Sequence, residues 1–194
     1  MRTPDHPRDR FVCLHDGPSG AEWFAEQILA LGASVVEAQH TLDLADAESV
    51  DAWVDHAVNA LERVDGAVHV VATGAAAYGA LTLQVRRPDL VRSLLLGDPT
   101  GPADSPDHRA LLAAVTAPTL VIASAPDDLD NAISADAQQI AGLVDNGVFV
   151  VIDGCAVPAH RERGSSFDEW ALSFAGIAEG LADLHTAQQE EAHV

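Results

Sequence analysis

The stretch VHVVATGAAAYGALTL, residues 68–83, has the pattern of a buried strand, a tight turn and a helix. Valine is frequent in its first part, and β-branched residues favour strands. We expect a strand over Ala67–Ala72 and a helix that runs from the TGAA turn to about Val85. A strand that leads directly into a helix is the repeating unit of a parallel α/β sheet, so this stretch indicates the fold class.

The same alternation of strands and helices continues on both sides of this stretch. The other expected strands are Phe11–Leu14, Ser34–Glu37, Val91–Leu96, Pro118–Ala123 and Val148–Ile152. Short strands rich in Val, Ile and Leu, most of them followed by a helix, predict an α/β fold with a mostly parallel sheet of about six strands and helices on both faces. We expect one domain over 11–184, with flexible tails at 1–10 and 185–194.

Several helix starts are marked by residues that can cap a helix with a side-chain oxygen. The expected caps are Ser19 with Glu22, Asp46, Ser134, and Ser166 with Glu169. The two Ser–Glu pairs have the spacing of a capping box. These positions predict where the helices begin.

The composition excludes several classes of partner. The formal net charge is −20, and all ten basic residues are arginine. Such a charge repels nucleic acid and anionic membranes. Two origins of the acidic surface stay open, a GC-rich genome and adaptation to salt. No apolar segment resembles a signal peptide or a membrane span, so we expect a cytoplasmic protein. The two cysteines, Cys13 and Cys155, do not have the spacing of a disulfide framework or a zinc site.

The turn at residues 72–76 does not carry a phosphate-binding motif. It has neither the G-x-x-x-x-G-K-[ST] nor the G-x-G-x-x-G pattern, and the chain contains no lysine for the first of these. The first turn, HDGPSG, also has its glycines at the wrong offsets for dinucleotide binding. We expect no cofactor.

Four segments, in order, resemble the α/β-hydrolase family. FVCLHDGPSG, from residue 11, is similar to the oxyanion loop, and VVATGAAAYGALTLQVRRPDLVRSLLLGDP, from residue 70, is similar to the nucleophile elbow and the helix behind it. APTLVIASAPDD and FVVIDGCAVPAHRERG resemble the strands and loops that deliver the acid and the histidine. Their order matches the Ser, Asp, His order of the family.

The resemblance implies a degenerate catalytic triad. Ungapped alignment puts Gly74 at the nucleophile position, Asp127 at the acid position and Val157 at the histidine position. A glycine cannot attack a substrate and a valine cannot accept a proton, so only the acid is kept. The oxyanion loop would comprise His15, Asp16 and Gly17, with Ala75 after the nucleophile position; Asp16 would oppose a developing negative charge.

The resemblance also implies a minimal member of the family. Only ten mostly polar residues precede Phe11, where full-length members have antiparallel strands, and the stretch between Leu96 and Thr119 has room for one short helix in place of a lid. The edge at Ser34–Glu37 would then be unpaired, and we expect the N-terminal tail or another subunit, in a homodimer, to cover it.

Other polar residues offer alternative sites. Cys155 and His160 share the last loop, and Ser19 and Tyr78 lie near the proposed site, where capping and packing explain them more simply. Asp127, Asp130, His15 and His160 do not have the spacing of a metal site, so no metal is expected.

Three classes of function remain open. The first, which we favour, is a binding or accessory protein without serine-hydrolase activity, with a small-molecule ligand or a protein partner, because function follows the site and not the fold. The second is an enzyme of non-standard chemistry, such as a lyase, isomerase or cyclase, that uses Asp127 and a histidine. The third is a hydrolase whose nucleophile is displaced to Cys155 or Ser19.

Overall fold

The computed structural model describes residues 10–102, 104–126 and 132–191, and its centre is one six-stranded sheet. The strands are β1 (Phe11–Leu14), β2 (Ser34–Val36), β3 (Val68–Thr73), β4 (Val91–Gly97), β5 (Thr119–Ala125) and β6 (Gly147–Asp153). All neighbouring pairs are parallel, in the order β2-β1-β3-β4-β5-β6. The predicted fold class is confirmed, and the strand positions agree to within one or two residues.

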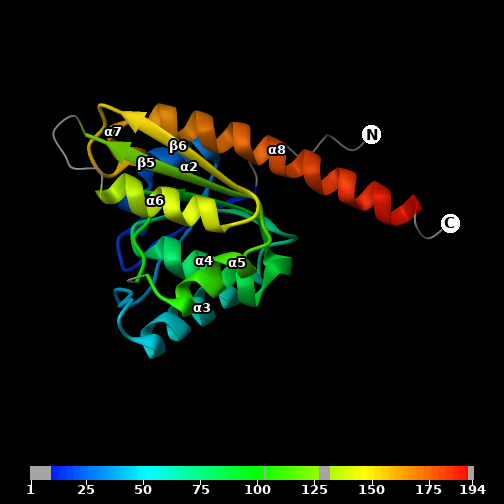
Figure 1. The fold of residues 1–194 in the computed structure, drawn as a ribbon, viewed down its shortest axis with the longest axis horizontal. Coiled ribbons are helices and arrows are strands. Elements are labelled where there is room, and N and C mark those ends of the chain that lie inside the picture. Colours follow the sequence, from blue (N-terminus) through cyan, green and yellow to red (C-terminus); the bar gives the residue numbers. More distant parts are fainter. Residues whose placement is uncertain (1–9, 103, 127–131, 192–194) are drawn as a thin grey trace.

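Helices cover both faces of the sheet, as expected for a parallel sheet (Figure 1). One face carries α1 (Gly20–Trp23), α2 (Ala25–Leu31), α7 (Ala159–Glu162) and α8 (Gly164–Glu191). The other carries α3 (Ala47–Leu61), α4 (Ala76–Arg86), α5 (Pro106–Ala114) and α6 (Ala132–Leu143). A 3-10 turn, η2 (Pro88–Leu90), precedes β4. Between β4 and β5, α5 is the only helix in the part of the chain that the structure describes.

The core has two layers because the central strands bury both of their faces. Every residue of β3 is buried, and alternate positions serve opposite layers. Val70 and Ala72 pack in the cluster beneath α3 and α4, whereas Val71 packs in the cluster beneath α2 and α8. Each fully buried Val or Leu side chain contributes about 1.5–3 kcal/mol to folding. The central strands therefore fix the positions of the turns at their carboxyl ends.

The predicted helix caps are confirmed at one position and wrong at the others. The Asp46 carboxylate accepts a hydrogen bond from the Glu48 amide and starts α3. Helix α6 begins before Ser134, and α8 begins at Gly164, before Ser166. The short helix α7 directly precedes α8 and leads the chain into it, so a serine cap at residue 166 is not needed.

The last helix, α8, is the longest and extends beyond the sheet (Figure 1). Its first half packs against α2, α7, β4 and β5. It continues to Glu191, past residue 184, where the sequence predicts the end of the domain. Among the described residues, no helix combines the length and the apolar character that a membrane span requires.

Candidate functional site

The strand order marks one position of the sheet at which a ligand site is expected. The chain runs outward from β1 to β2 and then returns to the other side of β1 with β3, so the order reverses between β1 and β3. In parallel sheets, ligands bind outside the carboxyl ends of the strands at this reversal. The two turns that meet there contain His15, after β1, and Gly74, after β3.

The β3–α4 turn at Gly74 has a left-handed backbone. Its φ is 55°, a value that glycine adopts without strain. The Gly74 amide donates to the Gly97 carbonyl (3.2 Å), and the Gly74 carbonyl accepts from the Thr100 amide (3.1 Å). A Cβ built at Gly74 has no atom within 4 Å. The turn thus has the sharp strand-to-helix form of a nucleophile elbow, with open space where a side chain would project.

The start of α4 behind this turn has no side-chain cap. Ala75 is the residue before the helix, and no described side chain caps it. The first amides of a helix have no partner within the helix. Tyr78, one turn further on, stacks on His108 from α5, with ring centroids 5.8 Å apart, and packs against the core. Tyr78 therefore contributes packing.

The β1–α1 turn is ordered by His15. The His15 Nδ1 atom lies 2.8 Å from the Gly17 carbonyl oxygen and 3.2 Å from the Gly17 amide nitrogen. Its Nε2 atom lies 3.6 Å from the Asp16 carboxylate. Both ring nitrogens thus face groups of the same turn.

The capping box predicted at Ser19 and Glu22 is wrong. Ser19 has a left-handed backbone, with φ 76°, and its side chain makes no cap hydrogen bond. The Glu37 carboxylate instead accepts from the Ala21 amide at 2.8 Å. Gly20 allows α1 to approach the turn closely, since a Cβ there would lie 2.8 Å from the His15 Cβ.

Trp23, the last residue of α1, is at the centre of the site. Its indole N–H donates to the Thr73 hydroxyl at 2.9 Å, next to Gly74. Its ring lies 5.8 Å from the His15 ring and 5.1 Å from the His160 ring. The Arg161 guanidinium stacks over the indole, 5.2 Å from the ring centre, which is cation–π geometry. Trp23 therefore occupies the space between the two loops.

His160 lies in an aromatic cluster and is fully buried. Its ring is 5.2 Å from the Phe24 ring and 6.0 Å from the Phe167 ring. Its ring nitrogens make no hydrogen bond of good geometry with a described residue. The pKa of His160 is lowered to about 4, chiefly by burial; a backbone contact with Trp23 raises it in part, and the nearby charge of Arg161 adds to the lowering. His160 is therefore neutral at pH 7.

In the connection between β6 and α8, Val157 is exposed to solvent, whereas Cys155 is buried. Val157 is 44% exposed, whereas Cys155 is 1% exposed. The Cys155 thiol lies 3.9 Å from the Ser124 hydroxyl and 3.3 Å from the Ala156 carbonyl oxygen. Burial raises the pKa of Cys155. A buried thiol with a raised pKa is a poor nucleophile.

Asp98, which sequence reasoning missed, anchors this connection. Its buried carboxylate accepts hydrogen bonds from the Ser124 amide (2.6 Å), the Ser124 hydroxyl (2.8 Å) and the Ala159 amide (2.7 Å). It joins the end of β4 to the end of β5 and to the start of α7. The sequence does contain a signal for Asp98, because this charged residue directly follows the apolar run LLLG at the end of a strand. Hydrogen bonds to a charged acceptor are about twice as strong as those between neutral groups.

A small open hollow lies beside Trp23. It has a volume of about 230 Å³ and is lined by His15, Ser19, Glu22, Trp23 and Arg161. It contains one cationic and one anionic side chain. Asp127 lies outside the described residues. Within the described residues, no group of three or more His, Cys, Asp or Glu side chains is arranged to hold a metal ion.

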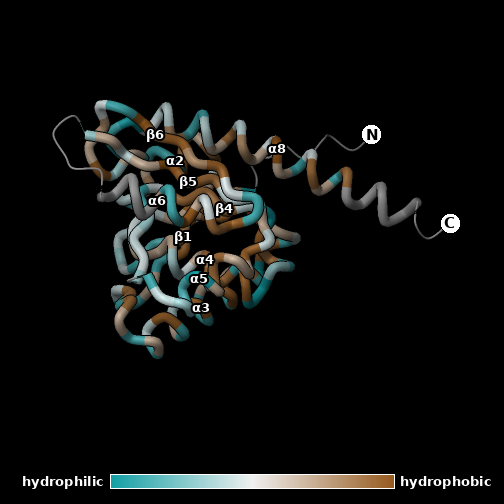
Figure 2. Tube along the Cα trace, viewed as in Figure 1, coloured by the Kyte–Doolittle hydropathy of each residue, from teal (hydrophilic) through white to brown (hydrophobic). Residues whose placement is uncertain are grey.

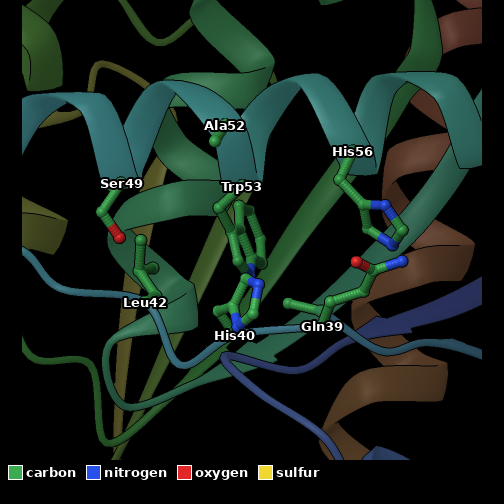
Figure 3. A pocket seen from close by; sticks show the side chains of 8 residues that line it. Gln39, His40, Leu42, Ser49, Ala52, Trp53 and His56 are labelled. Atoms are coloured by element: carbon green, nitrogen blue, oxygen red, sulfur yellow. The ribbon is translucent and has the colours of Figure 1, made fainter.

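A second hollow, of about 330 Å³, lies between residues 38–42 and α3. Trp53 forms its floor beside His40, and Gln39 and His56 extend toward each other at one end (Figure 3). The Trp53 indole N–H donates to the His15 carbonyl at 3.0 Å, so this floor also supports the β1–α1 turn.

The structure brings two of the predicted residues together. His15 and His160 meet on opposite sides of Trp23, beside the turn at Gly74. Val157 is at the surface. The central position of Trp23 depends on a long-range hydrogen bond to Thr73 that no local pattern predicts.

Comparison with known proteins identifies the fold. No family model and no curated protein matches the sequence. The structure is similar to a serine hydrolase involved in carbazole degradation, the CarC enzyme, with a TM-score of 0.69 and 15% identity over 86% of this chain and 90% of that chain. It is also similar to a serine hydrolase from the polyaromatic hydrocarbon-degrading bacterium Cycloclasticus zankles, with a TM-score of 0.68 and 12% identity over 88% and 92% of the two chains.

A third similar structure is a variant of the meta-cleavage product hydrolase CumD from Pseudomonas fluorescens IP01. The TM-score is 0.66 and the identity 14%, over 87% of this chain and 90% of that chain. Identities this low show a shared fold and leave activity open. The chain has the α/β-hydrolase fold.

Proposed function

We propose that this protein has no serine-hydrolase activity and acts as a binding or accessory protein. The observation that carries the proposal is the turn at Gly74. This turn has the backbone of a nucleophile elbow, but its residue has no side chain. An acyl-transfer site of this type requires a nucleophile next to a general base.

The histidines near the turn are poor substitutes for a general base. His15 is directed at Gly17 and Asp16 of its own turn. His160 is fully buried, its pKa is lowered to about 4, and Trp23 lies between it and Thr73. A general base works best with a pKa near the operating pH and a direct path to the proton. Both conditions count against His160.

The displaced nucleophiles also receive little support. Cys155 is buried and its pKa is raised, so little thiolate forms at neutral pH. Ser19 lines the same small hollow as His15, but the ring nitrogens of His15 already have partners. An enzyme based on Asp127 would need that carboxylate to meet a histidine, and Asp127 lies outside the described residues.

The hollow beside Trp23 is our candidate for a ligand site. Arg161 offers a charge and guanidinium hydrogen bonds, Glu22 offers a carboxylate, and Trp23 offers a ring face. A cavity of about 230 Å³ suits a small ligand, since pockets for drug-sized molecules begin near 300 Å³. We infer a small polar ligand with an anionic group for Arg161.

Turnover of short acyl esters tests this proposal. We expect the purified protein to hydrolyse p-nitrophenyl acetate no faster than a matched Gly74→Ala variant, which cannot gain a nucleophile at that position. The Cys155→Ala and Ser19→Ala variants should have the same background rate. Robust turnover that either of these two changes abolishes would contradict the proposal and identify a working enzyme with a displaced nucleophile.

A further inference from the structure

Large exposed hydrophobic side chains gather on one side of α8. Trp170, Ile177, Leu181 and Leu184 are all exposed, and Leu184 is the most exposed of them at 61%. Hydrophobic residues recur along this helix, including the part that extends beyond the sheet (Figure 2). Single exposed hydrophobic residues are common, whereas a contiguous apolar patch marks an interaction surface.

The spacing of these residues is that of a helix that pairs with another helix. They lie at positions 170, 177, 181 and 184, and Phe174, which is buried in the chain's own core, completes a pattern whose intervals alternate between four and three residues. This interval pattern places all five side chains along one line of the helix surface. We name this line the α8 stripe.

Two glycines next to the stripe leave room for a partner. Gly176 and Gly180 lie in the middle of α8, and a Cβ at either position would meet no atom within 4 Å. Each glycine inside a helix costs about 1 kcal/mol relative to alanine. No neighbour in the described part of the chain uses the space they leave. Small residues at such positions let two helix backbones approach each other closely.

The charge pattern of α8 argues against a basic partner. The chain carries a net charge of −20, but the α8 stripe itself is uncharged. Asp168 and Glu179, on the opposite flank of α8, are directed at Gln27 and at Arg92, respectively. A basic partner would be expected to dock on an acidic strip, and this strip is apolar. The cores of interfaces between copies are depleted of charge in the same way.

We propose that the α8 stripe binds the α8 stripe of a second copy of this chain. In an antiparallel pair about a twofold axis, Ile177 lies at the centre of the stripe, and Trp170 of each copy lies opposite Leu184 of the other. An isologous contact of this kind needs only one self-complementary surface. The inference does not depend on whether the site beside Trp23 is catalytic.

The area is sufficient for such a contact. The exposed parts of the stripe and of Val148, on the neighbouring edge strand β6, amount to roughly 400–500 Å² per copy, so complete coverage in a pair buries at most about 1,000 Å², which reaches the lower bound for a specific interface. Pairing would also give the projecting half of α8 a surface to pack against, and isolated helical segments are marginal in water. The alternative edge at β2 is only three residues long and offers less.

Sedimentation analysis of the full chain tests the proposal. We expect the wild type to form dimers at micromolar concentrations and the Ile177→Glu/Leu181→Glu variant to bind itself at least about 100-fold more weakly, because each change puts a charge into the interface core. The matched control is Leu29→Glu on α2, where a leucine that is 86% exposed lies away from the stripe. It should leave the dimer unchanged.

Salt dependence adds a second readout. Two copies that each carry a net charge of −20 repel one another, so raising the ionic strength should strengthen the dimer. A complex with a basic partner would weaken instead. A dimer that dissociates as salt is added contradicts the proposal.

Cross-linking locates the interface independently of stability. The Ile177→Cys variant should form an intermolecular disulfide under mild oxidation, whereas Leu29→Cys should not, and the native Cys13 and Cys155 are buried. A monomeric wild type at tens of micromolar, or a dimer that survives the double change and fails to cross-link at position 177, would overturn the proposal.

Discussion

The β3–α4 turn and the connection between β6 and α8, which the hydrolase resemblance assigns to the nucleophile and the histidine, differ in what they present. The turn at Gly74 keeps the left-handed backbone of an elbow, with open space in front of it. The connection carries no exposed histidine; its histidine, His160, is packed among Trp23, Phe24 and Phe167.

The difference shows which part of a site the fold itself maintains. The turn must reverse the chain between a buried strand and a helix that packs on it, so packing alone holds its backbone whether or not a nucleophile is present. The connection between β6 and α8 is held differently, by the Asp98 carboxylate and by packing around His160. Its residues form a hydrophobic and hydrogen-bonded cluster, and that cluster stabilises the fold without catalysis.

The largest effect on stability is expected for Asp98, which anchors the connection between β6 and α8. The Asp98→Ala change removes an acceptor of three hydrogen bonds and leaves buried donors unsatisfied. It also places alanine at a φ of 42°. We expect a loss of about 3–4 kcal/mol in the free energy of unfolding, measured in urea.

Two controls accompany this change. Asp98→Asn keeps one acceptor oxygen and tolerates the left-handed backbone, so it should lose about half as much. Asp107→Ala, at an exposed position in α5, should change stability by less than about 0.5 kcal/mol. Equal effects of Asp98→Ala and Asp107→Ala would show that Asp98 does not hold the loop.

Much of the fold could be predicted from the sequence, because it depends on local patterns. Buried valine-rich strands such as β3 and the cap at Asp46 are encoded in a few adjacent residues. The caps predicted at Ser19 and Ser134 failed for a different reason. The Ala21 amide finds the distant Glu37 carboxylate, so tertiary context decides the start of α1, and α6 starts before Ser134.

A smaller effect is expected from His160 and depends on pH. The unfolded chain protonates this histidine near pH 6.5, whereas the folded protein does so only near pH 4. Unfolding therefore takes up a proton below pH 6.5, and stability falls as the pH is lowered from 6.5 to 4. The His160→Phe change should remove about 2 kcal/mol of this loss at pH 5.

Unfolding in urea at pH 7.5 and pH 5 measures this prediction. His69, buried at the opposite end of the sheet with a pKa of about 4, should maintain the remaining pH dependence. His40→Gln, at an exposed histidine, controls for the loss of an imidazole. A His160→Phe variant with the same pH profile as the wild type would mean that His160 becomes charged in the folded protein.

The smallest effect on stability is expected at Gly74, in the β3–α4 turn. Gly74→Ala meets no clash, since the space around a Cβ is open, but it forces alanine to a φ of 55° at a cost of about 1 kcal/mol. Gly142→Ala, in α6, also has open space but a helical backbone, and it should stabilise the protein by about 0.5–1 kcal/mol. Opposite signs for the two changes would support the elbow geometry, and a stabilising Gly74→Ala would contradict it.

The site was less predictable than the fold. Alignment to the hydrolase pattern assigns Gly74 and Val157 from their distances to sequence motifs, and these two assignments stay predictions. It could not find the roles of Trp23 and Asp98. Each depends on partners far away in the chain, Thr73 for Trp23, and Ser124 and Ala159 for Asp98.

Covalent labelling with a fluorophosphonate probe, read by intact mass, tests the central claim most directly. We predict no adduct on the wild type and almost none on Gly74→Ser, because a serine without a base is not activated and single repairs of a triad add little. Gly74→Ser with Val157→His, in a chain that keeps Asp127, should give a slow adduct at position 74, and Asp16→Gly should increase it. Rapid labelling of the wild type at Ser19 or Cys155, accompanied by ester turnover, would contradict the claim that this fold has lost its nucleophile.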